Sequence, residues 1–412
     1  MLLPLLIALF VLLLVYNFHW KRRGLPPGPA PWPLVGNMPA FNRRPYGSFE
    51  EWQRRFGPVF TVWIAEQPAV VLADFATIRE TLVERADAFA GRFGFGEQSR
   101  VMKGGRLGVV DVDGEFWREQ RRFTLHTFRN FGMGRNLMEQ KILAQTEEVL
   151  AEVRVEQERN GSVDLPELLQ RCVGSVISRL LFGQGFEKDD FHTYKRLLTF
   201  LTDNAEEQLR ALIVDLFSAG QETTATTLVF LVCYFLNHPQ VGQRIERELA
   251  ERVGSERLIQ TDDRTALPYL NAVICETQRF LNLLPMNLFH ATTKEVDVRG
   301  FRLPAGTCVI PQIACVLSNE KLFPNPHAFD PQRFLDESGR LKHLDEFIPF
   351  SAGKRSCLGE SLARMELFLI AANLFNRFRI EPEDPQRPPS MHKIANFTAR
   401  CPPFRVRVRS RY

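Results

Sequence analysis

The chain has 412 residues, of which 45% are apolar and 24% charged, so it holds enough apolar material for a sizeable globular core. Its 52 basic and 48 acidic residues give a net charge of +4, which is too balanced to indicate a nucleic-acid-binding protein. The seven cysteines are scattered, without CxxC pairs or zinc-type spacing, which favours a reducing compartment over a disulfide framework.

The N-terminus carries the one membrane signal of the sequence. Residues 1–18 form an apolar run without charged side chains, and Tyr16 and Trp20 are suited to anchor it at a membrane interface. A cleaved signal peptide is the alternative, but no basic residue precedes the run and no small-residue cleavage site follows it. We therefore predict a transmembrane anchor over residues 1–20. The basic run at 21–23 predicts that the remaining chain lies in the cytosol.

A proline-dense segment follows the anchor. Dense proline excludes a helix, so we predict a basic and proline-rich hinge over residues 21–33 that is stiff and extended. A ligand for a proline-binding domain is the alternative reading of such a segment. The remaining residues, 34–412, are predicted to form the main domain of the chain.

The body of the chain reads mainly as helix with a minor β-sheet. Two β-rich runs flank a Glu66-Gln67-Pro68 turn and predict a hairpin, and the glycine-containing stretch 89–114 predicts loop. Helical periodicity dominates elsewhere. The predicted strands are 59–64, 69–72, 296–304, 307–311 and 404–408, and the predicted helices are 75–83, 116–128, 138–160, 165–182, 191–202, 209–237 and 362–378.

The segment 350–359 contains the most informative cysteine. A thiolate at Cys357 would be a soft, electron-rich metal ligand, and a helix beginning just after it would direct amide N–H groups at the sulfur. Gly353 permits a tight turn, and Gly359 lets a flat ligand approach the main chain. Taken alone, a cysteine is more often a buried and inert thiol.

A polar interruption marks the long apolar helix 209–237. An all-apolar helix is a buried helix, so Asp215, Glu222 and Thr223 are costly there unless something uses them. The missing side chain of Gly220 would leave room for a flat ligand and a small molecule. The alternative for the threonine is a hydrogen bond from its hydroxyl to its own helix.

Further polar pairs are spaced to share a helix face. Trp117 and Arg121 are four residues apart, and an arginine fork suits a carboxylate, although a core tryptophan with an exposed arginine is the plainer reading. Glu276 and Arg279 are three apart in apolar surroundings, which indicates a buried pair that needs a further partner such as Arg333. His290, taken alone, is an ordinary polar surface residue.

The decapeptide 350–359 fits the pattern Phe-x-x-Gly-x-Arg-x-Cys-x-Gly at every fixed position. With the other motifs in the same order, the chain resembles the animal microsomal cytochrome P450 family. The resemblance implies a haem-thiolate fold that binds haem b, with Cys357 as the ligand of the iron. It also implies that the haem contacts include Trp117, Arg121, His290, Arg355, Phe350, Gly353, Gly359, Ala219 and Gly220.

The resemblance further implies a monooxygenase at the endoplasmic reticulum membrane. Thr223 would assist dioxygen activation and Glu222 would help to deliver protons. One oxygen atom would enter a lipophilic substrate, which could be a fatty acid, a steroid or a xenobiotic, with electrons from an NADPH-dependent flavoprotein reductase. By the resemblance, Pro285, Leu288, Phe289 and Ala291 belong to the substrate wall, and the loop with Phe93 and Phe95 is a further candidate for it. The resemblance also implies that Glu276, Arg279 and Arg333 form a core network that supports the haem loop. Four basic residues near the cysteine would form a docking patch for an acidic reductase face, or some of them would only neutralise the haem propionates: Arg118, Arg122, Lys354 and Arg355.

The match fails once, between the predicted helix 165–182 and the long apolar helix. The family has a run of helices there, whereas this chain is shorter by on the order of seventy residues, with an internal gap near 203–207. The missing helices would form the roof over the substrate cavity. A haem-binding relative without turnover is therefore the second hypothesis, while isomerase or peroxygenase chemistry is disfavoured by Glu222 and Thr223.

Overall fold

The computed structural model describes residues 2–44, 47–94, 101, 103–130, 136–182, 204–394 and 396–412. Contacts within the chain define two compact units. The first unit comprises Met1–Phe95, Leu284–Pro324 and Ile348–Ser356, and the second comprises Gly96–Leu283, Asn325–Phe347 and Cys357–Tyr412.

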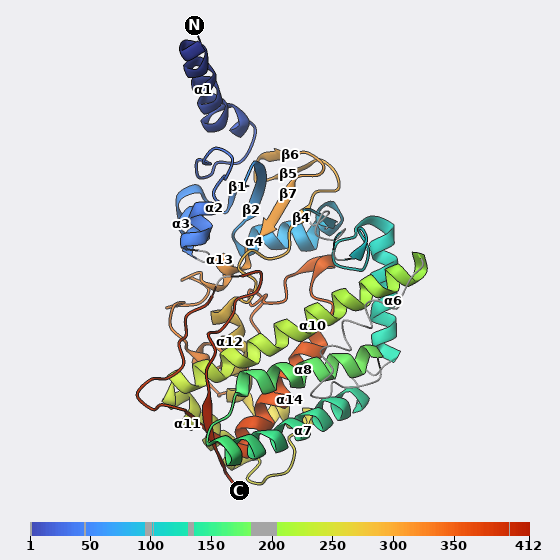
Figure 1. The fold of residues 1–412 in the computed structure, drawn as a ribbon, viewed down its shortest axis with the longest axis vertical. Coiled ribbons are helices and arrows are strands. Elements are labelled where there is room, and N and C mark those ends of the chain that lie inside the picture. Colours follow the sequence, from blue (N-terminus) through green and yellow to red (C-terminus); the bar gives the residue numbers. More distant parts are fainter. Residues whose placement is uncertain are drawn as a thin grey trace. The chain divides into compact units, whose positions relative to one another are not determined.

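The first unit is built on a five-stranded sheet with the order β1-β2-β7-β4-β3 (Figure 1). The predicted hairpin is confirmed, although its turn is Ala65-Glu66, earlier than predicted, because Gln67 and Pro68 already pair in the second strand. Side chains alternate between two apolar clusters on the faces of the sheet. The strands are β1 (Val59–Ile64), β2 (Gln67–Leu72), β3 (Gly91–Arg92), β4 (His290–Ala291) and β7 (Cys308–Pro311).

The predicted single strand at 296–304 is wrong. It is a hairpin of β5 (Val296–Val298) and β6 (Phe301–Leu303), because Arg299 and Gly300 adopt left-handed backbone angles that reverse the chain. The predicted helix at 75–83 begins as α4 (Phe75–Ile78), where the Asp74 side chain accepts a hydrogen bond from the Thr77 N–H at 2.7 Å. The π-helical segment Arg79–Glu84 continues α4, so helix covers the predicted range. The remaining helices of this unit are α2 (Met38–Arg43), α3 (Gly47–Phe56) and α13 (Ile313–Leu317), with short 3-10 turns at Trp20–Arg22, Ala86–Phe89 and Gly353–Arg355.

The N-terminal helix α1 (Leu2–Phe18) has the length and composition to cross a membrane over Leu3–Arg22. The hinge after it is extended as predicted, but it is not a free spacer. The Thr61 N–H donates to the Pro27 carbonyl at 2.9 Å, and a Cβ on Gly28 would lie 1.9 Å from the Thr61 oxygen. The hinge therefore lies directly against β1.

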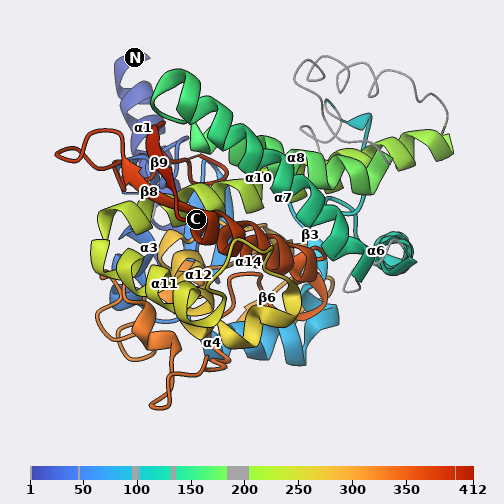
Figure 2. The same cartoon turned by 90° about the horizontal axis from the view of Figure 1, so that it is seen from below.

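The second unit is helical, and its long helix α10 (Asn204–Asn237) contacts α8, α12 and α14 (Figure 2). Apolar residues line α10 on all sides around its C-terminal half, which explains its burial between other helices. Its other helices are α6 (Gly114–Asn130), α7 (Asn136–Asn160), α8 (Leu165–Phe182), α11 (Pro239–Arg252), α12 (Pro268–Leu281) and α14 (Glu360–Arg377), with short turns Thr261–Ala266 and Pro331–Phe334.

A two-stranded sheet closes this unit. The predicted helix 362–378 ends at Arg377 because Phe378 begins β8 (Phe378–Pro382), which pairs with β9 (Val406–Ser410) in antiparallel register. The predicted helix at 191–202 lies outside the described residues.

Candidate functional site

Cys357 differs from five of the other cysteines, which are buried. It is exposed on one side, and α14 begins three residues later, so that the Gly359 N–H donates to its sulfur. The protein around its other sides raises the pKa of the thiol, while the Gly359 N–H and the Arg121 guanidinium act in the opposite sense. The exposed sulfur at a helix N-terminus is suited to a soft metal ion, whose charge would favour the thiolate.

Trp117 and Arg121 share one face of α6, as predicted, with the guanidinium carbon 5.8 Å from the indole centroid. Trp117 is buried and packs in a cluster that includes Leu358, the residue after the cysteine. Burial lowers the pKa of Arg121, and Cys357 opposes that shift. The structure thus brings a half-buried cation to the side of the candidate metal ligand.

Two glycines of the cysteine loop have separate roles. Gly353 has φ +76°, and a Cβ there would lie 1.7 Å from the Leu82 carbonyl oxygen, so the predicted tight turn is confirmed. Gly359 has an ordinary φ of −92°, and a Cβ on it would meet no atom within 4 Å. Open space beside Gly359, the exposed Cys357 sulfur and the nearby Arg121 together fit a flat, anionic, metal-containing ligand such as haem. Phe350 is half-buried in the same loop.

His290 lies in the first unit and is buried, so its description as an ordinary surface residue is wrong. Its Nδ1 lies 2.8 Å from the Phe89 carbonyl, which can only accept, so this nitrogen carries the proton. Burial, together with the positive charges of Arg92 and Arg355, lowers the pKa of His290 to about 3, although the hydrogen bond to Phe89 acts in the opposite sense. The ring is neutral, and its second nitrogen is the one left to face a ligand.

Arg355 and Arg92 are the two cations that lie near the neutral His290. Arg355 is buried, and its Nε donates to the Ala90 carbonyl at 2.8 Å. Arg92 pairs with His290 across β3 and β4 and donates to the Phe289 carbonyl at 3.3 Å. Both charges that act on His290 are positive, which suits the carboxylates of a ligand. Sequence reasoning missed Arg92, since only the long-range strand pairing places it beside His290.

The polar segment of α10, from Asp215 to Thr224, does not leave the open space that the sequence predicted beside Gly220. A Cβ on Gly220 would lie 3.0 Å from Cδ1 of Ile177, so this glycine allows α8 to approach closely, and the room predicted for a small molecule is filled. Thr223 is half-buried, and its hydroxyl donates to the Ala219 carbonyl at 2.7 Å. This is the alternative bond to its own helix, and it leaves the hydroxyl oxygen able to accept.

Glu222 and Thr224 point to different partners. The carboxylate of Glu222 accepts a hydrogen bond from the Thr398 hydroxyl at 2.6 Å and lies 3.7 Å from Arg400 Nε. Thr224 is buried and hydrogen-bonds to Glu366, whose pKa burial raises to about 8. Sequence reasoning missed Glu366, because a glutamate in a helix gives no local sign of complete burial.

Asp215 has a structural use that the sequence did not reveal. It accepts from Lys103 Nζ at 2.9 Å and from the N–H groups of Val109 and Val110 at 2.8 and 3.0 Å. Lys103 also contacts Asp111 at 2.5 Å. Burial raises the pKa of Asp215, whereas Lys103 and the two N–H groups act in the opposite sense. Asp215 therefore links the loop that contains Val109 and Val110 to helix α10.

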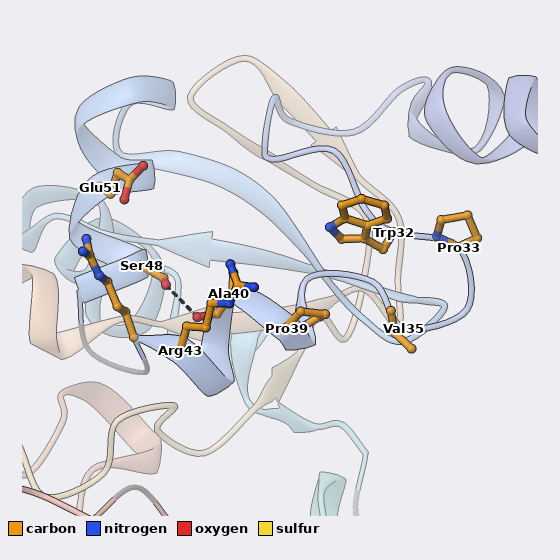
Figure 3. A pocket seen from close by; sticks show the side chains of 9 residues that line it. Trp32, Pro33, Val35, Pro39, Ala40, Arg43, Ser48 and Glu51 are labelled. Carbon is orange, nitrogen blue, oxygen red and sulfur yellow. Dashed lines mark hydrogen bonds between the residues drawn. The ribbon is translucent and has the colours of Figure 1, made fainter.

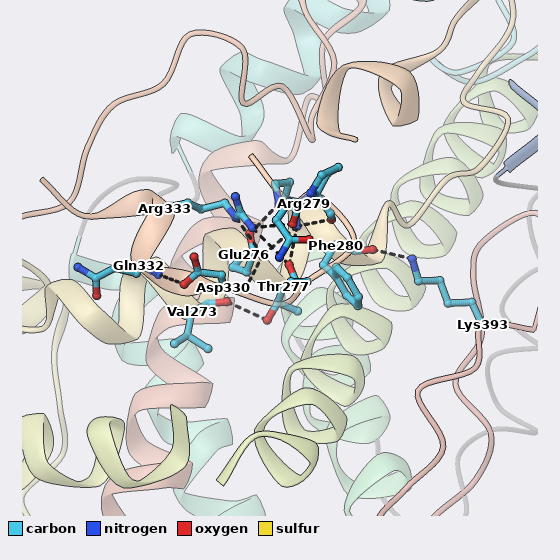
Figure 4. A network of polar contacts seen from close by, with 12 residues as sticks. Val273, Glu276, Thr277, Arg279, Phe280, Asp330, Gln332, Arg333 and Lys393 are labelled. Atoms are coloured by element: carbon cyan, nitrogen blue, oxygen red, sulfur yellow. Dashed lines mark hydrogen bonds and ion pairs between the residues drawn. The ribbon is translucent and has the colours of Figure 1, made fainter. Parts of the chain in front are cut away.

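The predicted core network is present in the second unit (Figure 4). Glu276 is fully buried and binds Arg279 at 2.7 and 2.9 Å, Arg333 at 3.2 Å and the Asp330 N–H at 2.8 Å. Arg279 also donates to the Pro326 carbonyl at 2.9 Å. Every charge in the group has several partners, as a buried network requires.

The weaker predictions have mixed outcomes. Phe93 and Phe289 are partly buried against one of the two apolar clusters on the sheet of the first unit, whereas Phe95 lies outside the described residues.

The inclusion of Arg355 in a docking patch is wrong, because its side chain is buried and the residue is only 7% exposed. Other members are exposed; Lys354 binds Asp87 at 2.6 Å, and Arg118 pairs with Glu115. Leu288 and Pro285 lie in the loop before β4, Ala291 is buried in β4, and Arg122 is exposed on α6.

Comparison with known proteins gives a consistent result. The sequence profile described as Cytochrome P450 matches this chain in two segments, residues 26–206 and 201–408. Cytochrome P450 2C16 of Oryctolagus cuniculus is 34% identical, covering 89% of this chain and 91% of the relative. Cytochrome P450 2C29 of Mus musculus is 31% identical over 487 aligned positions, covering 98% of each chain. With these matches, and with Cys357 beside Arg121 at the start of α14, the chain belongs to the cytochrome P450 family of haem b-binding monooxygenases.

Proposed function

We propose that this chain is a membrane-anchored monooxygenase of the endoplasmic reticulum that oxidises an apolar organic compound. Electrons would come from an NADPH-dependent flavoprotein reductase. The observation that supports this best is the exposed Cys357 sulfur, which accepts the Gly359 N–H beside the Trp117–Arg121 face of α6. Haem, when bound there, supplies the oxygen-activating chemistry.

The protein's own residues would bind and orient this group. Arg121 would hold a haem carboxylate. Within the first unit, Arg92 and Arg355 present guanidinium donors of the kind that bind a carboxylate, beside a neutral His290. The Gly359 N–H would stabilise the thiolate of Cys357 and so adjust its donor strength. Each of these groups acts by position and charge, with no covalent change.

Two proton-handling residues are proposed on α10. The Thr223 hydroxyl donates its proton to the Ala219 carbonyl and can accept a hydrogen bond in turn. Glu222 is partly exposed beside Thr398, so it can exchange protons with solvent. We propose that Glu222 passes protons toward the polar segment of α10 and that Thr223 orients the group that receives them.

The substrate class is proposed to be lipophilic: a fatty acid, a steroid or a xenobiotic. Phe93 and Phe289 are only partly buried although both are large and aromatic, which leaves apolar surface for a ligand. The apolar helix α1 would place the enzyme where such compounds concentrate. The basic run that follows it supports a cytosolic body.

The test is the carbon monoxide difference spectrum of the reduced full chain, followed by substrate-dependent NADPH consumption with added reductase. We expect a thiolate-type Soret band that Cys357→Ser abolishes. Cys401→Ser, which removes another cysteine that is not fully buried, should retain the band. An unchanged band in Cys357→Ser would refute the proposal.

A haem-binding relative without turnover is the second candidate, and the alignments favour it specifically. The alignment with the mouse relative runs over 487 positions, more than the 412 residues of this chain, and the family profile divides at residues 201–206. A missing roof would admit water to the pocket and release reduced oxygen before substrate is oxidised. A thiolate-type band with peroxide production but no oxidised product would establish this candidate. Sequencing transcripts across codons 195–215 would show whether the junction is natural.

A further inference from the structure

An open hollow of about 710 Å³ lies in the first unit, apart from the cysteine loop, and its volume is typical of a ligand site. We call it the hinge hollow. Its ends differ in chemistry: Trp32, Pro33 and Val35 lie at one end, and Ser48 and Glu51 at the other (Figure 3). Its lining residues are Trp32, Pro33, Val35, Pro39, Ala40, Arg43, Arg44, Ser48 and Glu51.

The polar part of the hinge hollow holds three exposed charges. Arg43 is the last residue of helix α2 and Arg44 follows it, and Glu51 lies on α3. Among the described residues, none of these three side chains has a hydrogen bond or an ion pair. The Ser48 hydroxyl is already used, since it donates to the Ala40 carbonyl at 3.1 Å. The hollow therefore offers two cations and one anion to a ligand.

The apolar end of the hinge hollow is fixed to the end of the membrane helix. The buried Asn17 side chain of α1 donates to the Pro31 carbonyl at 2.8 Å. Lys21 binds Glu66 at 2.8 Å, and the same carboxylate accepts the Leu34 N–H at 2.9 Å. Trp32 and Leu34 are nevertheless 64% and 78% exposed. Large exposed apolar side chains tied to a membrane helix are placed to contact lipid.

We propose that the hinge hollow binds one phospholipid whose headgroup carries a phosphate and a primary amine, namely phosphatidylethanolamine. Arg43 and Arg44 bind the phosphate, the arrangement that guanidinium groups favour. The lipid ammonium donates to Glu51, and the acyl region lies along Trp32 and Val35. Phosphatidylcholine carries the same charges but has no N–H to donate, so the site distinguishes the two lipids.

The experiment is native mass spectrometry of the full chain in detergent, titrated separately with phosphatidylethanolamine and phosphatidylcholine of identical acyl chains. The variants are R43A/R44A and Glu51→Ala. The matched control is R54A/R55A, which removes two exposed charges from α3 outside the hollow. Circular dichroism checks that each variant is folded.

We expect phosphatidylethanolamine to bind more tightly than phosphatidylcholine. R43A/R44A should weaken both lipids roughly tenfold or more, as the loss of a charge-assisted hydrogen bond predicts. Glu51→Ala, which leaves no acceptor for the lipid N–H, should remove the preference between them, and this variant decides the matter even if R43A/R44A does not fold. Equal binding of both lipids, or equal weakening in R54A/R55A, would overturn the proposal.

Discussion

Glu366 gives the chain a stability that depends on pH in a predictable direction. It is 2% exposed on α14, and among the described residues its Oε1 has no hydrogen-bond partner. Burial raises its pKa from 4.5 to about 8, and the hydrogen bond with Thr224 opposes the shift. The carboxyl group is therefore neutral in the folded chain at neutral pH and charged in the unfolded chain.

The sign follows from proton binding. Between about pH 4.5 and 8 the folded chain holds a proton that the unfolded chain has lost, so the free energy of unfolding falls as pH rises. The full contribution is present below the unfolded pKa and is lost once pH passes the folded pKa. The slope is about 1.4 kcal/mol per pH unit, and the whole window is worth roughly 5 kcal/mol.

The perturbation that isolates this effect is Glu366→Gln, which keeps the size of the side chain and removes its titration. The assay is denaturant unfolding at pH 5.5 and 7.5, read as the difference between variant and wild type so that other groups cancel. Over this interval the variant should gain roughly 3 kcal/mol relative to wild type. Glu251→Gln, an exposed glutamate on α11, should show no such change. Parallel pH dependences for wild type and Glu366→Gln would refute the reasoning.

Two further substitutions test the loop and the core network. Gly353→Ala should prevent stable folding, because φ is +76° and the new Cβ would meet the Leu82 carbonyl oxygen. The control Gly339→Ala has a similar φ of +77° but no atom near the new Cβ, so it should lower the free energy of unfolding by only about 1 kcal/mol. Soluble yield and thermal melting measure both variants. Glu276→Gln should destabilise the chain by about 3–5 kcal/mol in denaturant unfolding, because it leaves Arg279 buried without its carboxylate. A loss below about 1 kcal/mol would contradict a network of buried charges.

The sequence by itself determined the helices α6, α7, α8, α10 and α14, the hairpin of β1 and β2, and the turn of the cysteine loop, because these follow from local pattern. Periodicity places α10, and the spacing of Trp117 and Arg121 puts them on one face whatever lies opposite. Gly353 in its loop is likewise a local requirement of backbone geometry.

Only the tertiary structure decided which side chains are buried and what they contact. His290 and Arg92 meet through strands nearly two hundred positions apart in sequence, and Gly220 faces Ile177 of α8. Neither relation has a local signature, because burial and charge environment come from neighbours that are distant along the chain. For the same reason the neutral Glu366 could be recognised only after its helix was packed.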